Sequence, residues 1–243
     1  NIVDALSSRH YVTTELNDLL SEQIYQGFLE DLDPSKSYLL ASDIAEFDSL
    51  RYQLDDTLLR GDAKPAFIIF NRYHQRVLAR FESILAQLEK GTDVFDFERD
   101  ESLELDREEA PWATNNAELD DLWRKRLKNA VLNLRLADKE PEKIQELLLK
   151  RYKNRLTRTR QTNSEDVYQL YMNAFTRTYD PHTQCFPPRT SENFNINMRL
   201  SLQGIGAELS SEAGYTKVVR LIPGGPAQKA RARHWNEILP SLA

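Results

Sequence analysis

The chain has 243 residues, of which 40% are hydrophobic and 29% are charged, and its formal net charge is −6. This composition is ordinary for a chain that buries a core in water, and the length suits one large domain or two small ones. No run of about 18 apolar residues is present, so we expect no transmembrane segment. The negative charge argues against a nucleic-acid-binding protein, which would need a basic face.

Three amphipathic helices are predicted in the first 91 residues. The first covers about 14–32 and ends at Asp33-Pro34, and its apolar face consists of Leu16, Leu19, Leu20, Ile24 and Phe28. The second begins at the capping-box pair Asp43 and Glu46 and ends near Gly61. The third begins near Pro65 and ends before Gly91. Each helix has one apolar stripe to bury, so we expect a bundle.

Residues 91–114 form the next segment, which lacks a sustained hydrophobic period and contains nine acidic residues. We interpret it as a connecting segment on the surface and call it the acidic arm. Phe95, Phe97 and Trp112 are the side chains expected to anchor it.

Helical signals resume after the acidic arm. Asn115 with Glu118 is a cap signal, and the helix that follows turns Leu119, Leu122, Trp123 and Val131 inward. A second helix is predicted from Pro141 through Leu156. A third begins at Asn163 or Ser164 and ends at Asp180-Pro181.

The hydrophobic period changes from 3.6 to 2 after about residue 198. Residues 199–202 alternate, and residues 215–222 are rich in β-forming side chains between glycine and proline signals. The sequence therefore predicts a mainly α fold, in which a helical bundle domain at 1–197 is followed by a smaller β-containing domain at 198–243.

The densest basic run is KRYKNRLTRTR, at residues 150–160. Contact with nucleic acid would need these charges on one face, together with aromatic residues or a groove. Acidic residues flank the run on both sides and Leu156 interrupts it. A solvated helix face is therefore the favoured interpretation.

Metal and cofactor sites have little support in the sequence. The four histidines, His10, His74, His182 and His234, are scattered, and no pair has the spacing of a metal-binding motif. The single cysteine, Cys185, permits neither an internal disulfide nor a Cys-based cluster. We expect no metal and no cofactor.

The tetrapeptide Asp180-Pro181-His182-Thr183 has two interpretations. Its carboxyl, imidazole and hydroxyl groups are those of acid–base chemistry, but a triad also needs an activated nucleophile within hydrogen-bond reach. The favoured alternative is a turn at the end of a helix, which His182 and Thr183 stabilise by hydrogen bonds.

The stretch LQGIGA, at residues 202–207, precedes a predicted strand. Its glycines allow successive backbone N–H groups to form a concave nest for an anion, and the edge of the strand beside it could accept an extended peptide with its terminal carboxylate in the nest. A glycine bulge leading into an ordinary strand is the alternative.

Three motifs occur in the order, and at about the spacing, expected in C-terminal processing peptidases: Asp180-Pro181-His182-Thr183, LQGIGA, and Gly224-Gly225-Pro226-Ala227. The chain resembles in particular the tail-specific protease branch, which consists of bacterial periplasmic serine endopeptidases of the S41 type. The stretches LDPSKSYLLASDIAEF, Ala110-Pro111-Trp112, KRYKNRL and QTNSEDV look like the helical N-terminal domain of that branch. The resemblance covers nearly the whole chain up to Ala230.

In such enzymes a helical domain is followed by a PDZ domain and then by a protease core with a Ser-Lys dyad. The resemblance implies that residues 198–243 are a partial, truncated PDZ domain. No residue of this chain matches the dyad, so no catalytic residue is assigned and the chain alone is expected to be inactive.

The resemblance also implies a role in substrate capture and positioning. It places the binding of a peptide C-terminus at Leu202, Gly204, Ile205, Gly206 and Ala207, through backbone amides and an apolar pocket. The implied partners are protein substrates with apolar C-termini and a helical-repeat lipoprotein adaptor, and the implied location is the bacterial periplasm.

The similarity to the family is weaker after Ala227, where residues 231–238 match only loosely. A second hypothesis therefore stays open, in which the chain is a free-standing helical interaction or adaptor protein of protease ancestry. Whether the gene continues in frame into a Ser-Lys core distinguishes the two hypotheses.

Overall fold

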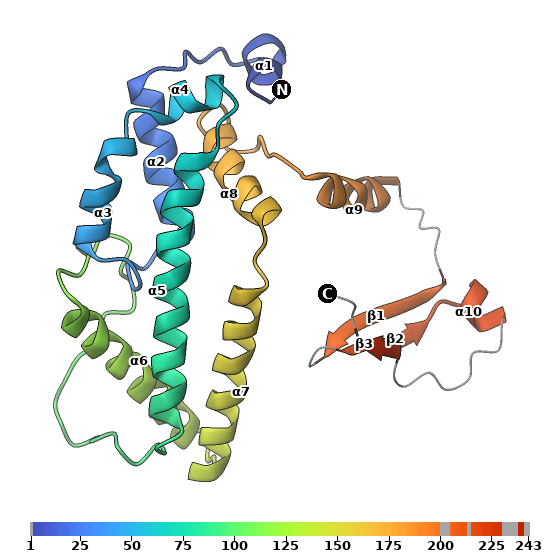
Figure 1. Cartoon of the computed structure of the whole chain (residues 1–243). Coiled ribbons are helices and arrows are strands. Elements are labelled where there is room, and N and C mark those ends of the chain that lie inside the picture. Colours follow the sequence, from blue (N-terminus) through green and yellow to red (C-terminus); the bar gives the residue numbers. More distant parts are fainter. Residues whose placement is uncertain (1, 200–204, 213–214, 230–237, 241–243) are drawn as a thin grey trace. The chain divides into compact units, whose positions relative to one another are not determined.

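The computed structural model describes residues 2–199, 205–212, 215–229 and 238–240 (Figure 1). The chain divides into two compact units, Asn1–Cys185 and Phe186–Ala243, which we call the helical unit and the C-terminal unit. Helices predominate among the described residues, and each described strand belongs to the C-terminal unit, so the predicted mainly α class is confirmed.

The helices of the helical unit alternate with short connections, apart from the acidic arm. Their bounds are α1 Ile2–Arg9, α2 Asp18–Leu32, α3 Ala41–Phe47, a 3-10 turn Asp48–Leu50, α4 Leu54–Leu59, α5 Lys64–Leu88, α6 Asn116–Leu136, α7 Pro141–Arg160 and α8 Ser164–Arg177.

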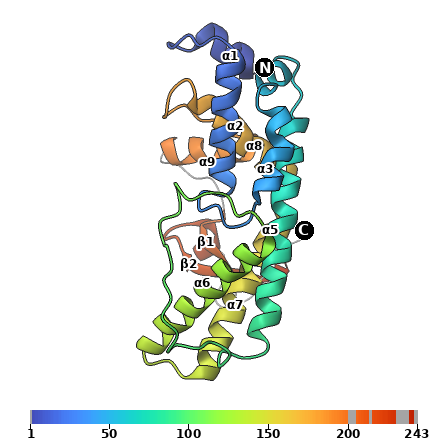
Figure 2. The same cartoon turned by 90° about the vertical axis from the view of Figure 1, so that its left-hand side faces the viewer.

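The long helix α5 contributes to both large hydrophobic cores of the helical unit. Figures 1 and 2 show α2, α3, α4 and α8 beside its first half and α6 and α7 beside its second half. Ile69 and Phe70 belong to the first core, which is formed with α2, α4 and α8. Phe81 and Ile84 belong to the second core, which is formed with α6 and α7. The apolar stripe of α5 is therefore buried along its whole length.

Three helix starts follow the sequence signals. Pro65 lies in the first turn of α5, as predicted. The side chain of Asn115 accepts a hydrogen bond from the backbone N–H of Glu118 at the start of α6. Asn163 caps α8 in a reciprocal capping box with Asp166. These caps satisfy N–H groups that the first turn of a helix leaves without partners.

The predicted second helix is wrong in two respects. It is broken into α3, the 3-10 turn and α4, because Ser21 of α2 donates its hydroxyl to the Arg51 carbonyl at 2.7 Å and accepts the Leu54 N–H at 2.8 Å. Helix α3 also begins at Ala41, before Asp43, and Asp43 lies in its first turn, where its carboxylate accepts the Leu40 N–H. A tertiary contact therefore ends a helix that the local pattern would continue.

Leu19 was predicted on the apolar face of the first helix, but its side chain is 66% exposed. Leu20, Ile24 and Phe28 are buried, and they fix the orientation of α2. Because neighbouring residues lie about 100° apart around a helix, Leu19 then points away from the core.

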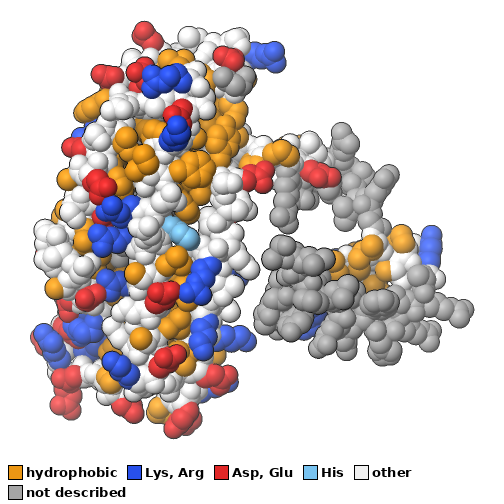
Figure 3. Space-filling model, viewed as in Figure 1, with side chains coloured by type: hydrophobic (Ala, Val, Ile, Leu, Met, Phe, Trp, Pro, Cys, Tyr) orange, Lys and Arg blue, Asp and Glu red, His pale blue; other side chains and the backbone are white. Residues whose placement is uncertain are grey.

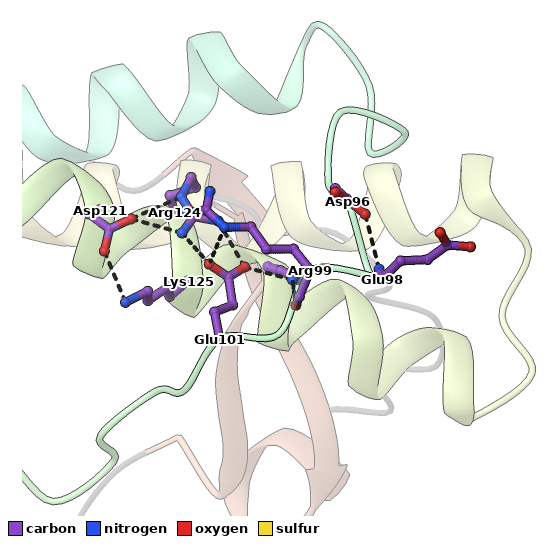
Figure 4. Close-up of polar contacts among 8 residues, drawn as sticks. Asp96, Glu98, Arg99, Glu101, Asp121, Arg124 and Lys125 are labelled. Atoms are coloured by element: carbon purple, nitrogen blue, oxygen red, sulfur yellow. Dashed lines mark hydrogen bonds and ion pairs between the residues drawn. The ribbon is translucent and has the colours of Figure 1, made fainter.

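The acidic arm has the anchors that the sequence predicts. Phe95 and Phe97 pack against the second core and Trp112 against the first. Glu101 attaches the arm to α6, because its carboxylate accepts bonds from Arg124 at 2.5 and 3.0 Å (Figure 4). It also accepts a bond from Lys128 at 2.6 Å. The arm is thus fixed by apolar contacts near its ends and by an ion-pair cluster near its middle.

The C-terminal unit begins with a helix that the sequence pattern did not indicate, α9 Pro188–Arg199. It is followed by β1 Ala207–Glu212, β2 Tyr215–Leu221, the short helix α10 Pro226–Lys229 and β3 Ile238–Pro240. The strands pair antiparallel in the order β1-β2-β3, with a bulge between Glu208 and Leu209. The predicted strand at 215–222 is confirmed as β2.

Within the described residues, no helix is both long and apolar enough to cross a membrane.

Asp43 is the most strongly paired buried carboxylate at the α3–α5 contact. It accepts bonds from Arg76 at 2.9 and 3.0 Å, from Arg72 at 2.7 Å and from the Leu40 N–H at 2.9 Å. Burial alone would raise the pKa of Asp43, but these hydrogen bonds outweigh it and hold that pKa below its ordinary value.

We predict that Asp43→Asn lowers the free energy of unfolding by about 2–4 kcal/mol, because it removes the carboxylate of Arg76 and the shorter of the two ion pairs of Arg72. Glu46→Gln is the matched control, since Glu46 is exposed and contacts only Arg72. It should cost at most about 1 kcal/mol. Urea unfolding at neutral pH measures the free energy of unfolding of both variants.

The Asp43 contribution should also depend on pH in a defined direction. A pKa lowered by folding gives stability that is complete above the unfolded value, near pH 4, and that is lost as the pH falls through the folded value. The stability difference between the unmodified protein and the Asn variant should therefore shrink at about pH 3. A difference that stays constant from neutral pH would contradict this role.

Glu101→Gln should loosen the acidic arm. The hydrogen bonds from Arg124 and Lys128 lower the pKa of Glu101 to about 2, so it is charged at neutral pH and an amide would lose both ion pairs. Hydrogen exchange of the arm should accelerate while that of α5 stays unchanged. Glu98→Gln on the same arm is the control, and equal acceleration by both variants would argue against the attachment.

Candidate functional site

The described part of the predicted peptide site is the segment Ile205–Ala207, which leads into β1. Leu202 and Gly204, predicted at the same site, lie outside the described residues. The Ile205 side chain is 57% exposed. Gly206 has a φ of 74°, in the left-handed region that glycine tolerates.

Two successive carbonyl groups in this segment both accept hydrogen bonds from the stretch 222–227. The Ile205 carbonyl accepts the Ala227 N–H at 2.8 Å, and the Gly206 carbonyl accepts the Ile222 N–H at 2.8 Å. Both donors belong to the stretch 222–227, which contains Gly224-Gly225-Pro226. In a regular strand successive carbonyls would alternate, and the positive φ of Gly206 removes that alternation.

The direction of the amide groups follows from that of the carbonyls. None of the peptide bonds described is cis, and in a planar trans peptide a carbonyl and the next N–H point in opposite directions. The N–H groups of Gly206 and Ala207 therefore both point away from the 222–227 turn. Among the described strands β1 lies at the edge of the sheet, so these two donors lie on its outer side.

The turn packs so closely that only glycine fits at position 206. A Cβ on Gly206 would lie 2.9 Å from Pro226 Cδ and 3.0 Å from the Gly225 Cα. Gly206 of one predicted glycine motif is thus in direct contact with Gly225 and Pro226 of the other. Two N–H donors on one side of a strand that lies at the edge of the described sheet can bind a carboxylate and extend the sheet by one peptide strand.

The described part of the C-terminal unit has several exposed apolar side chains on and near its strands. Leu209, Val219 and Ile222 are exposed in addition to Ile205. Each buried hydrophobic cluster of the described chain is made of residues before Phe186.

The Asp180–Thr183 tetrapeptide forms a turn, as the favoured interpretation predicted. The Asp180 side chain accepts the His182 N–H at 2.6 Å, and its carbonyl accepts the Thr183 N–H at 3.0 Å. The Thr183 hydroxyl lies 3.0 Å from Nε2 of His10, and no hydrogen bond joins it to His182 within the described chain. These contacts connect the N-terminal segment to the end of α8.

The other candidate groups that the structure describes, His74 and Cys185, do not form a reactive site with each other. His74 bonds to the Thr159 carbonyl at 2.8 Å, and His234 lies outside the described residues. Burial raises the pKa of the Cys185 thiol, which disfavours a reactive thiolate. In the ranges that the structure describes, no three His, Cys, Asp or Glu side chains are placed to hold a metal ion.

Three surface hollows of the helical unit are lined by the acidic arm. One lies between the arm and the end of α2 and includes Lys36, Arg107 and Trp112. The other two lie between the arm and α6. Arg107 already pairs with Glu104, and Arg124 already pairs with Glu101. We therefore assign these hollows no chemistry.

The profile of the family described as "Tail specific protease N-terminal domain" matches residues 2–189. The chain belongs to this family. It is also 36% identical over 230 residues to a "Tail-specific protease" of Haemophilus influenzae, an alignment that covers 94% of this chain and 33% of that relative. The chain thus spans about a third of the length of this relative.

Gly206→Ala should disrupt the start of the sheet in this family member. The new Cβ would clash with Pro226 and Gly225, and alanine disfavours a positive φ. Amide exchange of Ile222, which donates to the Gly206 carbonyl, should become much faster.

Gly224→Ala is the matched control for this substitution. Gly224 has a φ of 76°, but a Cβ there would meet nothing within 4 Å, so the change should cost only about 1 kcal/mol of backbone strain. Equal exchange rates in the two variants would show that close packing at position 206 is unimportant.

Proposed function

We propose that this chain is the substrate-capturing N-terminal region of a serine endopeptidase that selects proteins by their C-terminal residues. In this proposal the helical domain, residues 1–197, helps to hold the substrate, and residues 198–243 are part of a PDZ domain. Family membership and the similarity to a relative called a tail-specific protease support the proposal.

The single observation that carries the binding role is the common direction of the N–H groups of Gly206 and Ala207. A peptide carboxylate has two acceptor oxygens, and charge-assisted bonds from two backbone donors would fix it at the end of β1. The substrate chain would then extend along the open edge of β1, as in other cases of strand addition.

The apolar side chains near this edge favour a substrate with an apolar C-terminus. Ile205 lies beside the two donors and is largely exposed, so a neighbouring apolar side chain would remove it from water. Leu202 and Gly204 complete the proposed site on the basis of the family resemblance alone.

The proposal assigns no catalytic residue in this chain and places the reaction in a Ser-Lys core of the whole enzyme. It also places the enzyme in the bacterial periplasm, with a helical-repeat lipoprotein as an adaptor. A serine-hydrolase probe should leave the 243-residue chain unlabelled, and stoichiometric labelling would contradict the proposed division of roles.

A binding titration tests the capture role. A fluorescent peptide that ends in apolar residues with a free carboxylate should bind more tightly than the same peptide with an amidated C-terminus, by about tenfold or more, because amidation removes the charge that the two N–H groups bind. Gly206→Ala should abolish the preference and Gly224→Ala should retain it. Equal affinity for the two peptides would refute the carboxylate site.

A further inference from the structure

The second half of α7 has an unusual distribution of charge. Between Glu146 and Glu165 the sequence contains six basic residues and no acidic one, although the chain as a whole carries −6. The six side chains are all exposed: Lys150, Arg151, Lys153, Arg155, Arg158 and Arg160. On the face drawn in Figure 3, basic side chains lie over α7 in the lower half of the helical unit.

Three arginines of α6 and α7 act electrostatically on Tyr152, and two of them also act on Tyr38. Burial raises the pKa of Tyr152, and the positive charges of Arg155, Arg151 and Arg126 oppose that rise. Arg155 and Arg126 act in the same way on Tyr38, whose pKa burial raises to about 12. Arg126 of α6 and Arg155 of α7 lie over the Trp123 and Tyr152 rings, and both of these rings contact Phe81. Arg151 lies about one turn before Arg155 on α7, and we call these three guanidinium groups the arginine patch.

Aromatic rings hold two of these guanidinium groups in place. Arg126 lies over the Trp123 ring, 5.0 Å from its centroid, and Arg155 lies over the Tyr152 ring at 5.6 Å. Stacking orients the planar guanidinium group and leaves its N–H edge available for bonds.

The arginine patch lacks the acidic partners that other arginines of the unit have. No carboxylate in the described part of the chain forms an ion pair with Arg126, Arg151 or Arg155, whereas Arg124, two positions before Arg126, pairs with both Glu101 and Asp121. Arg126 is half-buried, and burial lowers its pKa below the ordinary value.

An unpaired, partly desolvated cation is costly, and a carboxylate from elsewhere would offset that cost. Asp33 acts on Arg126 only through space, because its oxygens accept backbone N–H groups of residues 37–39. The folded chain thus presents cations that its own carboxylates do not neutralise.

We propose that the arginine patch is a docking surface for an acidic polypeptide segment. Arg151 and Arg155 are about 6 Å apart along the helix axis, and alternate side chains of an extended peptide are spaced by about 6.6 Å. Alternate carboxylates of one segment can therefore reach both arginines, and Arg126 offers a third site.

Charge complementarity favours a short acidic segment over a long polyanion. Nucleic acid or an anionic membrane would extend past the patch and approach the acidic arm, which has eight exposed carboxylates. Repulsion from these groups and from the net charge of −6 opposes a large anionic surface.

Fluorescence anisotropy with a labelled oligoglutamate peptide tests the docking surface on the whole chain. We expect saturable binding that weakens with added salt, and no binding of an oligoglutamine peptide of the same length. The double variant Arg126→Gln, Arg155→Gln should weaken binding by about tenfold or more, because it removes two charge-assisted contacts.

The control variant Arg9→Gln, Arg60→Gln removes the same charge from exposed positions outside the patch and should bind as the unmodified protein does. Circular dichroism establishes that each variant is folded. If the variant Arg126→Gln, Arg155→Gln is unfolded, the variant Arg126→Lys, Arg155→Lys replaces it. That variant keeps the charges but loses the planar guanidinium groups, so its affinity should also fall.

Several outcomes would overturn the proposal. Unchanged affinity of the patch variants, an equal loss in the control variant or equal binding of oligoglutamine would exclude the arginine patch as an acidic-peptide site. Tighter binding of an oligonucleotide or of phosphatidylglycerol vesicles through the same arginines would assign the patch to another class of partner. Patch-dependent self-association would support it and identify the acidic arm of a second copy as the segment.

Discussion

The carboxylate of Asp33 holds the turn on which the helical unit depends. It is buried and accepts backbone N–H groups of Ser37 and Tyr38 at 2.8 Å and of Leu39 at 3.0 Å. This turn places Leu39 in the first core and the Tyr38 ring against Phe81 and Trp123 of the second. Because Trp123 also donates to the Ser37 carbonyl, one short loop couples the two cores that share α5.

Charged side chains have two different roles in this unit. Asp43 and Glu101 are each bound by two cations, and they attach α3 to α5 and the acidic arm to α6. In the arginine patch, Arg126 and Arg155 have ring contacts, and no carboxylate of the described residues forms an ion pair with the patch. Paired charges stabilise the fold, whereas unpaired and oriented charges are available to a partner, at some cost in stability.

In the C-terminal unit a departure from regular strand geometry creates the candidate site. A strand would direct the N–H groups of residues 206 and 207 to opposite sides, so only one could reach a ligand. The positive φ of Gly206 directs both to the outer edge of β1, and the tight contact with Gly225 and Pro226 keeps them there. The same two glycine motifs carry the family resemblance.

The sequence alone determined the features that depend on neighbouring residues. Apolar periodicity and the Asn115 and Asn163 caps located the later helices, and Pro65 located the start of α5. The β-forming run located β2. Each of these signals acts within one or two helical turns or within one strand. The glycine motifs also identified Gly206 before its geometry was known. The amphipathic pattern of α9 was missed, since its polar residues obscure the period.

Only the tertiary structure decided where distant groups meet. The Ser21 hydroxyl breaks the helix predicted from Asp43 to Leu58 by bonding residues 30 and 33 positions away. Asp43 binds two arginines of α5 in addition to the Leu40 N–H at the start of α3. The basic run at 150–160 was predicted to be an ordinary solvated face. Its place beside Arg126, Trp123 and Tyr38 results from the packing of α6 against α7. Such contacts form only when separate helices share a core, so the spacing of residues along the chain cannot predict them.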